Sequence, residues 1–363
     1  MLSKIIRQVL LLKAKDVKIG NKIIGYDNPT YFIAEAGVNH NGKIELCLEM
    51  IEEAQKAGAD AIKFQTFKAS QVCLPKTATT SYQKKNTGRT NQQTLLKSLE
   101  LNEKFYPVLQ KKCQDLKIDF LSTPHGHIKS AKFLNKLNVP VFKISSADIT
   151  NLPFLSYLAN LKKLVLLSTG TVTLEEINQA LTLFDKKKCP VVVMHCVTAY
   201  PTPAREANIG AILDLYRTFP DKLIGYSDHT VLPESLLMAA GFGASVLEAH
   251  FTLDKNLAGP DQKNSFNPNQ LKKIIQKIHT IEKIIGSGFK IPGRSELINA
   301  PLVRKSITTT KSIKKGEFLN ENNLTIRRPE SGGVLPKFWW KIIGRKASKK
   351  LPADYQLKKG DWQ

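Results

Sequence analysis

Short apolar runs alternate with longer amphipathic stretches along most of the chain. Eight runs of seven to nine residues, rich in Val, Ile, Leu and Phe, have the length and composition of buried strands. They cover residues 31–37, 59–67, 118–124, 141–148, 163–170, 190–196, 222–228 and 245–253. The stretches between and after them, such as residues 44–59, 174–187 and 267–285, place apolar residues at helical spacing.

This rhythm predicts a fold class. Strands that are apolar on both faces, each followed by a helix, are typical of a parallel sheet covered by helices. Eight such units match the size of a (β/α)8 TIM barrel, which has roughly 250 residues. A doubly wound open sheet is the alternative, but no Gly-rich dinucleotide turn supports it.

The rhythm changes near residue 286. We expect residues 1–286 to form the barrel domain, including an amphipathic N-terminal extension that lacks the cleavage site of a signal peptide. Residues 287–300, rich in Gly, Pro and Ser, have the composition of a linker. Residues 301–363 contain short β-like runs and predict a small second domain. A polar, irregular segment at residues 74–96 is long for a barrel loop, so we expect it to be functional or mobile.

Charge and composition narrow the function classes. The chain carries 54 Lys and Arg against 31 Asp and Glu, a formal net charge of +23. This excess is compatible with nucleic-acid binding, but the basic residues are scattered and no nucleic-acid-binding motif accompanies them. We therefore expect no nucleic-acid partner and a lysine-rich surface that attracts a small anionic substrate.

The same inventory bears on location. No apolar run reaches membrane-spanning length, so we expect no membrane segment. The five cysteines form no CxxC pair and their number is odd, which argues against a disulfide framework or a zinc knuckle. A cytoplasmic location fits these features best.

Polar side chains gather where the expected strands end, which in a barrel of this type is where the chemistry takes place. Any one of them alone could simply cap the following helix. Their presence at all eight ends favours an active site. The residues are Glu35, Lys63, Gln65, Ser122, Thr123, Lys143, Ser146, Asp148, Ser168, Thr169, His195, Asp228, His229, Glu248 and His250.

Two groups of these residues have distinct chemistry. Lysines and hydroxyls form charge-assisted hydrogen bonds to oxyanions, so the first group is suited to a phosphate and a carboxylate. Its members are Lys63, Thr123, Lys143, Ser146 and Ser168.

The second group is a pair of histidines. His229 and His250 end neighbouring strands and could share a metal ion, with Asp261 nearby as a further acid. Two histidines are a weak metal signature, because catalytic zinc sites have three protein ligands. The spacing leaves open whether they bind metal or are only hydrogen-bonded.

The order of the motifs resembles that of the bacterial sialic acid synthase family. The motifs are AEAGVNHNG, GADAIKFQTF, FLSTP, FKISSADITNLP, LLSTG, MHCVTAYPTP, GYSDHT, LEAHFTLDKNLAGPD and IKKGEF followed by NLTIRRP. The resemblance runs from about residue 16 to about residue 350. It implies a (β/α)8 barrel followed by a small C-terminal antifreeze-like (SAF) domain. The most similar members make N-acetylneuraminate or N,N′-diacetyllegionaminate.

The resemblance also implies a reaction. Phosphoenolpyruvate would add through C3 to the aldehyde of an N-acetylmannosamine-type sugar, and phosphate would leave by C–O cleavage. A divalent metal, typically Mn²⁺ with Mg²⁺ or Co²⁺ as alternatives, would be held by His229 and His250 and polarise the aldehyde. Glu35 matches the acid/base of the family.

Further roles follow from the same matches. Phosphoenolpyruvate would be held by Lys63, Thr123, Lys143, Ser146 and Ser168. The sugar would be faced by Gln65, Asp148, Tyr200 and Asp261. Arg328 would reach into the barrel of a partner subunit, which implies a domain-swapped homodimer. His40 ranks below the histidine pair, as a residue that shapes the loop after Glu35.

The chain departs from the family pattern at several positions, including the replacement of the usual residues by His125, Thr171, Ala249 and Asp148. The small residues usual after SDHT are replaced by residues 231–233. These departures put the identity of the sugar in doubt. Two alternatives remain, another phosphoenolpyruvate-condensing sugar-acid synthase, of pseudaminate or keto-deoxy type, and a non-catalytic sugar-binding barrel.

Overall fold

A computed structural model describes residues 13–125 and 128–363. The expected N-terminal amphipathic segment lies almost entirely outside the described residues. The chain divides into two compact units, with the boundary between Phe289 and Lys290.

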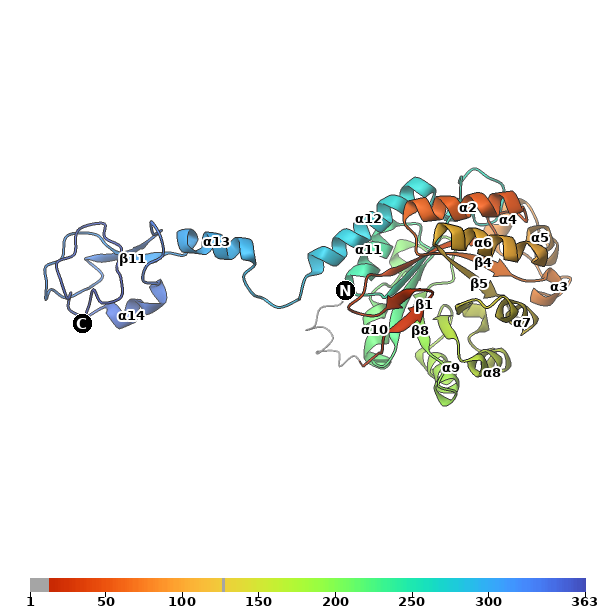
Figure 1. Cartoon of the computed structure of the whole chain (residues 1–363), viewed down its shortest axis with the longest axis horizontal. Coiled ribbons are helices and arrows are strands. Elements are labelled where there is room, and N and C mark those ends of the chain that lie inside the picture. Colours follow the sequence, from red (N-terminus) through yellow and green to blue (C-terminus); the bar gives the residue numbers. More distant parts are fainter. Residues whose placement is uncertain (1–12, 126–127) are drawn as a thin grey trace. The chain divides into compact units, whose positions relative to one another are not determined.

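The first unit is built on eight parallel strands. They are β3 (Tyr31–Gly37), β4 (Ala61–Thr66), β5 (Asp119–Pro124), β6 (Val141–Ile144), β7 (Leu164–Ser168), β8 (Val191–Cys196), β9 (Leu223–Asp228) and β10 (Val246–His250). Their order in the sheet is β5-β4-β3-β10-β9-β8-β7-β6, and β5 packs beside β6, so the sheet nearly closes on itself. The predicted barrel is confirmed, and every predicted strand coincides with an observed one. The strands are buried on both faces because helices surround them (Figure 1).

Helices connect successive strands on the outside of the barrel. They are α2 (Ile44–Ala57), α6 (Tyr106–Leu116), α7 (Ile128–Lys136), α8 (Leu152–Leu161), α9 (Leu174–Lys186), α10 (Ala211–Thr218), α11 (Pro233–Gly241) and α12 (Pro268–Ile285). Local sequence sets their ends. Thr173 and Glu176 form a capping box at the start of α9, as do Asn267 and Gln270 at the start of α12.

Two features of the barrel unit differ from the prediction. An unpredicted antiparallel hairpin, β1 (Val17–Ile19) and β2 (Lys22–Ile24), buries Ile19 and Ile24 in the core, and Lys22 pairs with Asp60 just before β4. The segment expected to be irregular contains α4 (Ser81–Thr87) and α5 (Gln92–Leu99), and it follows the one-turn helix α3 (Ala69–Val72). The prediction of irregularity was wrong because capping at Thr80 and Asn91 starts helices that polar composition concealed.

The second unit has its own core. The helix α13 (Arg294–Val303) begins within the residues expected to form a linker. An antiparallel pair, β11 (Ser306–Thr309) and β12 (Leu324–Arg327), and the short helix α14 (Trp339–Ile342) follow. The apolar side chains that form this core are Ile307, Ile313, Leu319, Leu324, Ile342, Ala347, Leu351 and Leu357. Throughout the described part of the chain, no helix combines the length and apolar character needed to cross a membrane.

Candidate active site

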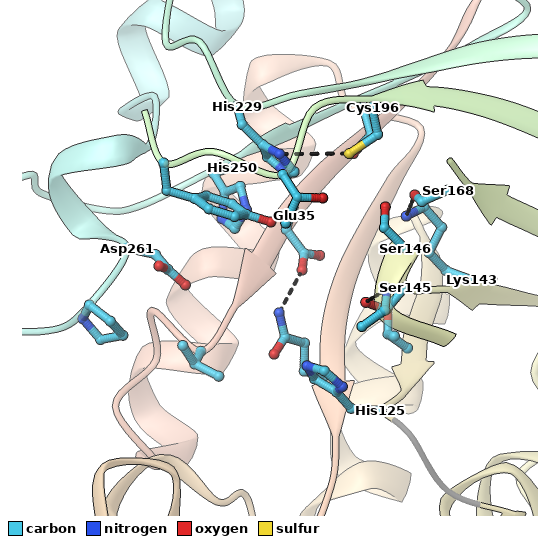
Figure 2. Close-up of a pocket in the computed structure, with 18 of the residues that line it drawn as sticks. Glu35, His125, Lys143, Ser145, Ser146, Ser168, Cys196, His229, His250 and Asp261 are labelled. Atoms are coloured by element: carbon cyan, nitrogen blue, oxygen red, sulfur yellow. Dashed lines mark hydrogen bonds between the residues drawn. The ribbon is translucent and has the colours of Figure 1, made fainter. Parts of the chain in front are cut away.

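A cavity of about 240 Å³ lies at the carboxyl ends of the barrel strands. Figure 2 shows His229, His250 and Asp261 on one side of it and Lys143, Ser146 and Ser168 on the other. Among the residues that line it are Glu35, Lys63, Gln65, Thr123, Lys143, Ser146, Ser168, Tyr200, His229, His250 and Asp261. Strand register brings them together, because Glu35 on β3 lies opposite His250 on one neighbouring strand and Lys63 on the other.

Two carboxylates and two lysines form a buried network on the cavity wall. Lys63 Nζ lies 2.7 Å from Glu35 Oε2 and 3.6 Å from Glu248 Oε1. Lys143 Nζ lies 3.4 Å from the same Glu248 oxygen. Glu248 also accepts a hydrogen bond from Ser227 at 3.1 Å. All four charged side chains are buried, so each ion depends on its partners to compensate for lost hydration.

The environment separates the pKa values of the two carboxyl groups. Burial raises the pKa of Glu35, and the nearby Lys63 only partly offsets this effect. Burial also acts on Glu248, but Lys143 and Lys63 outweigh it and lower its pKa to about 2. Although burial opposes its charge, Lys63 has a raised pKa because Glu248 and Glu35 flank it. Glu248 therefore remains an anion, and Glu35 is the carboxyl group poised to exchange a proton.

Hydroxyl groups accompany the two lysines. Lys63 Nζ donates to Thr123 Oγ1 at 3.0 Å, and Lys143 Nζ donates to Ser168 Oγ at 2.6 Å. Ser146 Oγ accepts the backbone N–H of Gly170 at 2.9 Å. The predicted oxyanion-binding set thus lies together along one side of the cavity. Two cations and several hydroxyls in one concave wall can bind a small molecule with more than one anionic group.

Two imidazole rings lie next to each other on the opposite side of the cavity from the lysines and hydroxyls (Figure 2). The ring centroids of His229 and His250 are 5.4 Å apart, and Tyr200 packs 4.1 Å from the ring of His229. His229 Nδ1 is hydrogen-bonded to Val197 O at 2.7 Å, which leaves its Nε2 free to bind a ligand. Cys196 Sγ lies 3.7 Å from the same Nδ1.

These two histidines fit a divalent ion that keeps most of its coordination sphere for water and substrate. His250 Nδ1 is buried and has no hydrogen-bond partner within the described residues. Over residues 13–125 and 128–363, no three His, Cys, Asp or Glu side chains are grouped as a complete metal site. His229 and His250 are the residues that would hold such an ion.

Asp261 lies on the loop that follows β10. Its pKa is raised to about 6 by burial, and Oδ1 has no hydrogen-bond partner among the described residues. Tyr82 of α4 stacks on Tyr200 with 5.1 Å between ring centroids, and Asn86 Nδ2 donates to Pro260 O at 2.7 Å. The long segment after β4 thus contributes to the cavity and holds the loop that carries Asp261.

The residues after Glu35 organise the rim of the barrel. Asn39 Nδ2 donates to Phe251 O at 2.8 Å and to Ser265 Oγ at 2.9 Å. Gln262 Nε2 donates back to Asn39 O at 2.9 Å. His40 is fully buried, and its Nδ1 accepts from Gly42 N at 3.0 Å. These contacts fasten the loop after β3 to the loop of Asp261, and neither Asn39 nor His40 lines the cavity.

Some strand-end residues serve the fold. Asp228 accepts hydrogen bonds from Tyr226, Thr230 and Ser235, and its role is to order the turn that begins α11. His195 Nε2 is hydrogen-bonded to Ala207 O at 3.0 Å. Neither residue is among those that line the cavity.

Two residues expected to face the sugar do not line the cavity within this chain. Asp148 is buried and accepts from Asn151 Nδ2 at 3.2 Å, but it is not among the cavity-lining residues. Its neighbours Ser145 and Ser146 do line the cavity. Arg328 belongs to the second unit, where it is exposed and lines a separate hollow with Arg327.

The departures from the family pattern have different consequences. Ala249 is fully buried in the core on the outer face of β10, because strand alternation points its neighbours Glu248 and His250 into the cavity. His125 lies directly on the cavity wall. Thr171 and Val231, both β-branched, have φ of 63° and 60°, a strained conformation in the loops after β7 and β9.

Several cavity residues carried no role in the sequence interpretation. Glu248 was noted as a strand-end residue, but only the structure reveals that it links the two lysines. Tyr82, Gln83 and Gln92 could not be found from sequence, because nothing in a polar segment indicates which side chains turn inward. For Cys196 the sequence did offer a signal, since it is the last residue of β8 and other site residues also end strands.

Comparison with known proteins identifies the family of the chain. The NeuB family matches residues 50–290, and the SAF domain matches residues 304–361. The chain is 42% identical to the N,N′-diacetyllegionaminic acid synthase of Campylobacter jejuni subsp. jejuni serotype O:2, over 90% of this chain and 98% of that protein. It is 37% identical to the N,N′-diacetyllegionaminic acid synthase of Legionella pneumophila, over 93% of this chain and 96% of that protein.

A solved structure extends the likeness to three dimensions. The crystal structure of N-acetylneuraminic acid synthetase from Leptospira borgpetersenii, in complex with citrate, matches with a TM-score of 0.71 at 35% identity. The match covers 79% of this chain and 95% of that one. The NeuB family matches most of the barrel, a SAF domain follows it, and synthases are among the relatives. These findings agree with the resemblance found in the motifs. This chain therefore belongs to the NeuB family.

Proposed function

We propose that this protein is a nonulosonic acid synthase that condenses phosphoenolpyruvate with an acetamido sugar of the N-acetylmannosamine type. The product would be N-acetylneuraminate or N,N′-diacetyllegionaminate. The observation that carries the proposal is the division of one cavity into a side with two lysines and a side with two histidines, with Glu35 between them. That division matches a substrate pair of one small dianion and one neutral sugar aldehyde.

The lysine side would bind phosphoenolpyruvate. Lys63 and Lys143 would pair with its phosphate and carboxylate, and the hydroxyls of Thr123, Ser146 and Ser168 would complete the hydrogen bonds. Held in this way, C3 of phosphoenolpyruvate would point toward the histidine side. Holding C3 of phosphoenolpyruvate close to the aldehyde carbon removes much of the entropic barrier to forming the C–C bond.

The histidine side would bind the sugar. His229 and His250 would hold a divalent ion, for which we propose Mn²⁺, and such an ion supplies Lewis-acid polarisation of the aldehyde oxygen. Gln65, Tyr200 and Asp261 would contact the sugar hydroxyls and acetamido group. Gln65 Nε2 already donates to Glu35 Oε1 at 3.3 Å, so it can position the carboxyl group and the sugar together.

Glu35 would move the proton. When C3 attacks the aldehyde carbon, C2 becomes electron-deficient and takes up water. A carboxylate beside that water can accept its proton, and the resulting carboxylic acid can return a proton to the sugar oxygen. The C–O bond between C2 and phosphate then breaks, the departing phosphate takes up the proton of the C2 hydroxyl, and the α-keto acid remains.

Phosphate release tests the proposal directly. The protein would be incubated with phosphoenolpyruvate, Mn²⁺ and either N-acetylmannosamine or 2,4-diacetamido-2,4,6-trideoxymannose. We expect phosphate release that depends on the sugar, stops when EDTA removes the metal and returns when Mn²⁺ is restored. If metal is bound and no such sugar supports release, the synthase proposal is wrong. If phosphate is released only with the pseudaminate precursor or only with an unacylated sugar phosphate, the protein is instead a sugar-acid synthase of the pseudaminate or keto-deoxy type.

Arg328→Ala tests the proposed domain-swapped homodimer. If Arg328 reaches the sugar site of a partner subunit, the variant should raise the KM for the sugar about tenfold or more, as expected for loss of a charge-assisted contact. The KM for phosphoenolpyruvate should change little. Arg327→Ala is the matched control, because the guanidinium of Arg327 donates a hydrogen bond to Asp354 within the same unit. Equal rises in both KM values for Arg328→Ala would contradict the assigned contact.

A further inference from the structure

One wall of the cavity is apolar, in contrast to its charged sides. Val38, Val72, Leu96 and Leu99 line it, and we call these four residues the apolar wall. They belong to a small hydrophobic cluster of their own, separate from the barrel core. Part of their surface nevertheless faces the cavity. Apolar surface that faces water in a binding site favours an apolar group of the ligand.

A polar atom without a partner lies at the same wall. Gln92 is the first residue of α5, the helix that carries Leu96 and Leu99, and it also lines the cavity. Its buried Oε1 accepts no hydrogen bond from any residue that the structure describes. A buried acceptor without a donor is costly, so this atom favours a ligand that brings an N–H or O–H group. An unpaired acceptor beside a methyl-binding surface complements the N–H and the methyl group of an acetamido substituent.

The order of the strands indicates which end of the sugar meets the wall. Lys63 and Lys143 come from β4 and β6, and the two histidines come from β9–β10. In the apolar wall, Val38 belongs to the loop after β3, and the other three residues belong to the long segment after β4. With phosphoenolpyruvate on the lysines and the aldehyde carbon near the histidines, the wall is the sector left for the part of the sugar farthest from the aldehyde.

We infer, on the basis of the proposed function, that the apolar wall and Gln92 receive the C4 acetamido group and the C6 methyl group of a 2,4-diacetamido-2,4,6-trideoxymannose. N-acetylmannosamine carries hydroxyls at both positions. The C4 hydroxyl can donate to Gln92 Oε1, but neither hydroxyl brings a methyl group to Val72 and Leu96, and the C6 hydroxyl would lose water there without gaining a partner. The enzyme therefore prefers the doubly acetamidated, 6-deoxy sugar.

The preference is measured on the unmodified enzyme by phosphate release with each sugar. We expect kcat/KM for the diacetamido trideoxy sugar to exceed that for N-acetylmannosamine at least about tenfold, since single apolar groups in a pocket discriminate by roughly 10–200-fold. A preference for N-acetylmannosamine, or equal values, would overturn the inference while leaving the synthase proposal intact. No release with either sugar would count against the synthase proposal itself and would remove the basis of this preference.

Val72→Thr then tests the wall. The substitution replaces one methyl group by a hydroxyl of the same size, so the fold is retained. The ratio of the two kcat/KM values should move about tenfold toward N-acetylmannosamine, as a polar group replaces part of the methyl-binding surface. Val108→Thr, at a position that is 49% exposed on α6, is the matched control and should leave the ratio unchanged. An equal loss of kcat/KM for both sugars in Val72→Thr would mean that the wall meets a group that both sugars share, which contradicts the assignment.

Discussion

Glu35→Gln is expected to lower kcat by roughly 10²–10⁴-fold, the usual contribution of a positioned acid or base. The substitution keeps the shape and the hydrogen bond from Gln65 but removes the ability to accept a proton. The fold should survive, because Lys63 keeps Glu248 as a counter-ion at 3.6 Å. Lys63 loses its nearer counter-ion, so the melting temperature should fall while the transition stays cooperative. Steady-state phosphate release and a melting curve check both expectations.

Glu282→Gln is the matched control for that variant. Glu282 is also a buried carboxylate, but it lies on α12 and accepts the backbone N–H of Thr30 at 2.6 Å, away from the cavity. Its substitution weakens a charge-assisted hydrogen bond that joins the last barrel helix to the start of β3, so the melting temperature should fall while kcat is retained. If Glu35→Gln lost stability and kept its turnover, Glu35 would be a structural residue like Glu282.

The barrel could be predicted because its signal is local and repeated. Each strand is a short apolar run that must be buried on both faces, and each is followed by an amphipathic helix. Once the strands are known, the side chains at their ends must meet at one rim. Glu35, Lys63 and His250 could therefore be grouped without coordinates, and strand register places them side by side.

The remaining parts of the site depend on contacts that no sequence pattern encodes. The helices α4 and α5 are held by caps and by hydrogen bonds such as Asn86 to Pro260 O, so a polar segment becomes ordered through its neighbours. Gln92 lines the cavity only because α5 packs its leucines inward. Asp148 illustrates the reverse case, since it follows a strand but does not line the cavity and accepts a hydrogen bond from the neighbouring Asn151.

The histidines at strand ends separate into two kinds that their sequence contexts do not distinguish. His195 is buried beside the ring of Tyr226 and hydrogen-bonded to Ala207 O, which is sufficient to explain its presence. His250 faces the cavity and has a buried ring nitrogen without a partner in the part of the chain that the structure describes. A satisfied histidine stabilises the fold, whereas an unsatisfied one facing a cavity is better explained by a ligand.

His250→Ala is therefore expected to abolish turnover, with a loss of at least about a thousandfold, since a polarising metal ion contributes several kcal/mol to transition-state stabilisation. Bound Mn²⁺, measured by metal analysis after dialysis, should fall together with activity. Stability should fall only modestly, because in the absence of metal His250 lacks a partner for Nδ1 among the described residues.

His195→Ala provides the opposite expectation. It removes a ring that is stacked on Tyr226 and hydrogen-bonded to Ala207 O, so it should lower the melting temperature and leave bound Mn²⁺ unchanged. If His250→Ala loses its cooperative thermal transition and the folded fraction keeps its metal content, the role of His250 is to stabilise the fold. If instead the metal leaves and the transition stays, the same residue that ends the last barrel strand acts through the ion, because loss of packing alone would not change metal content.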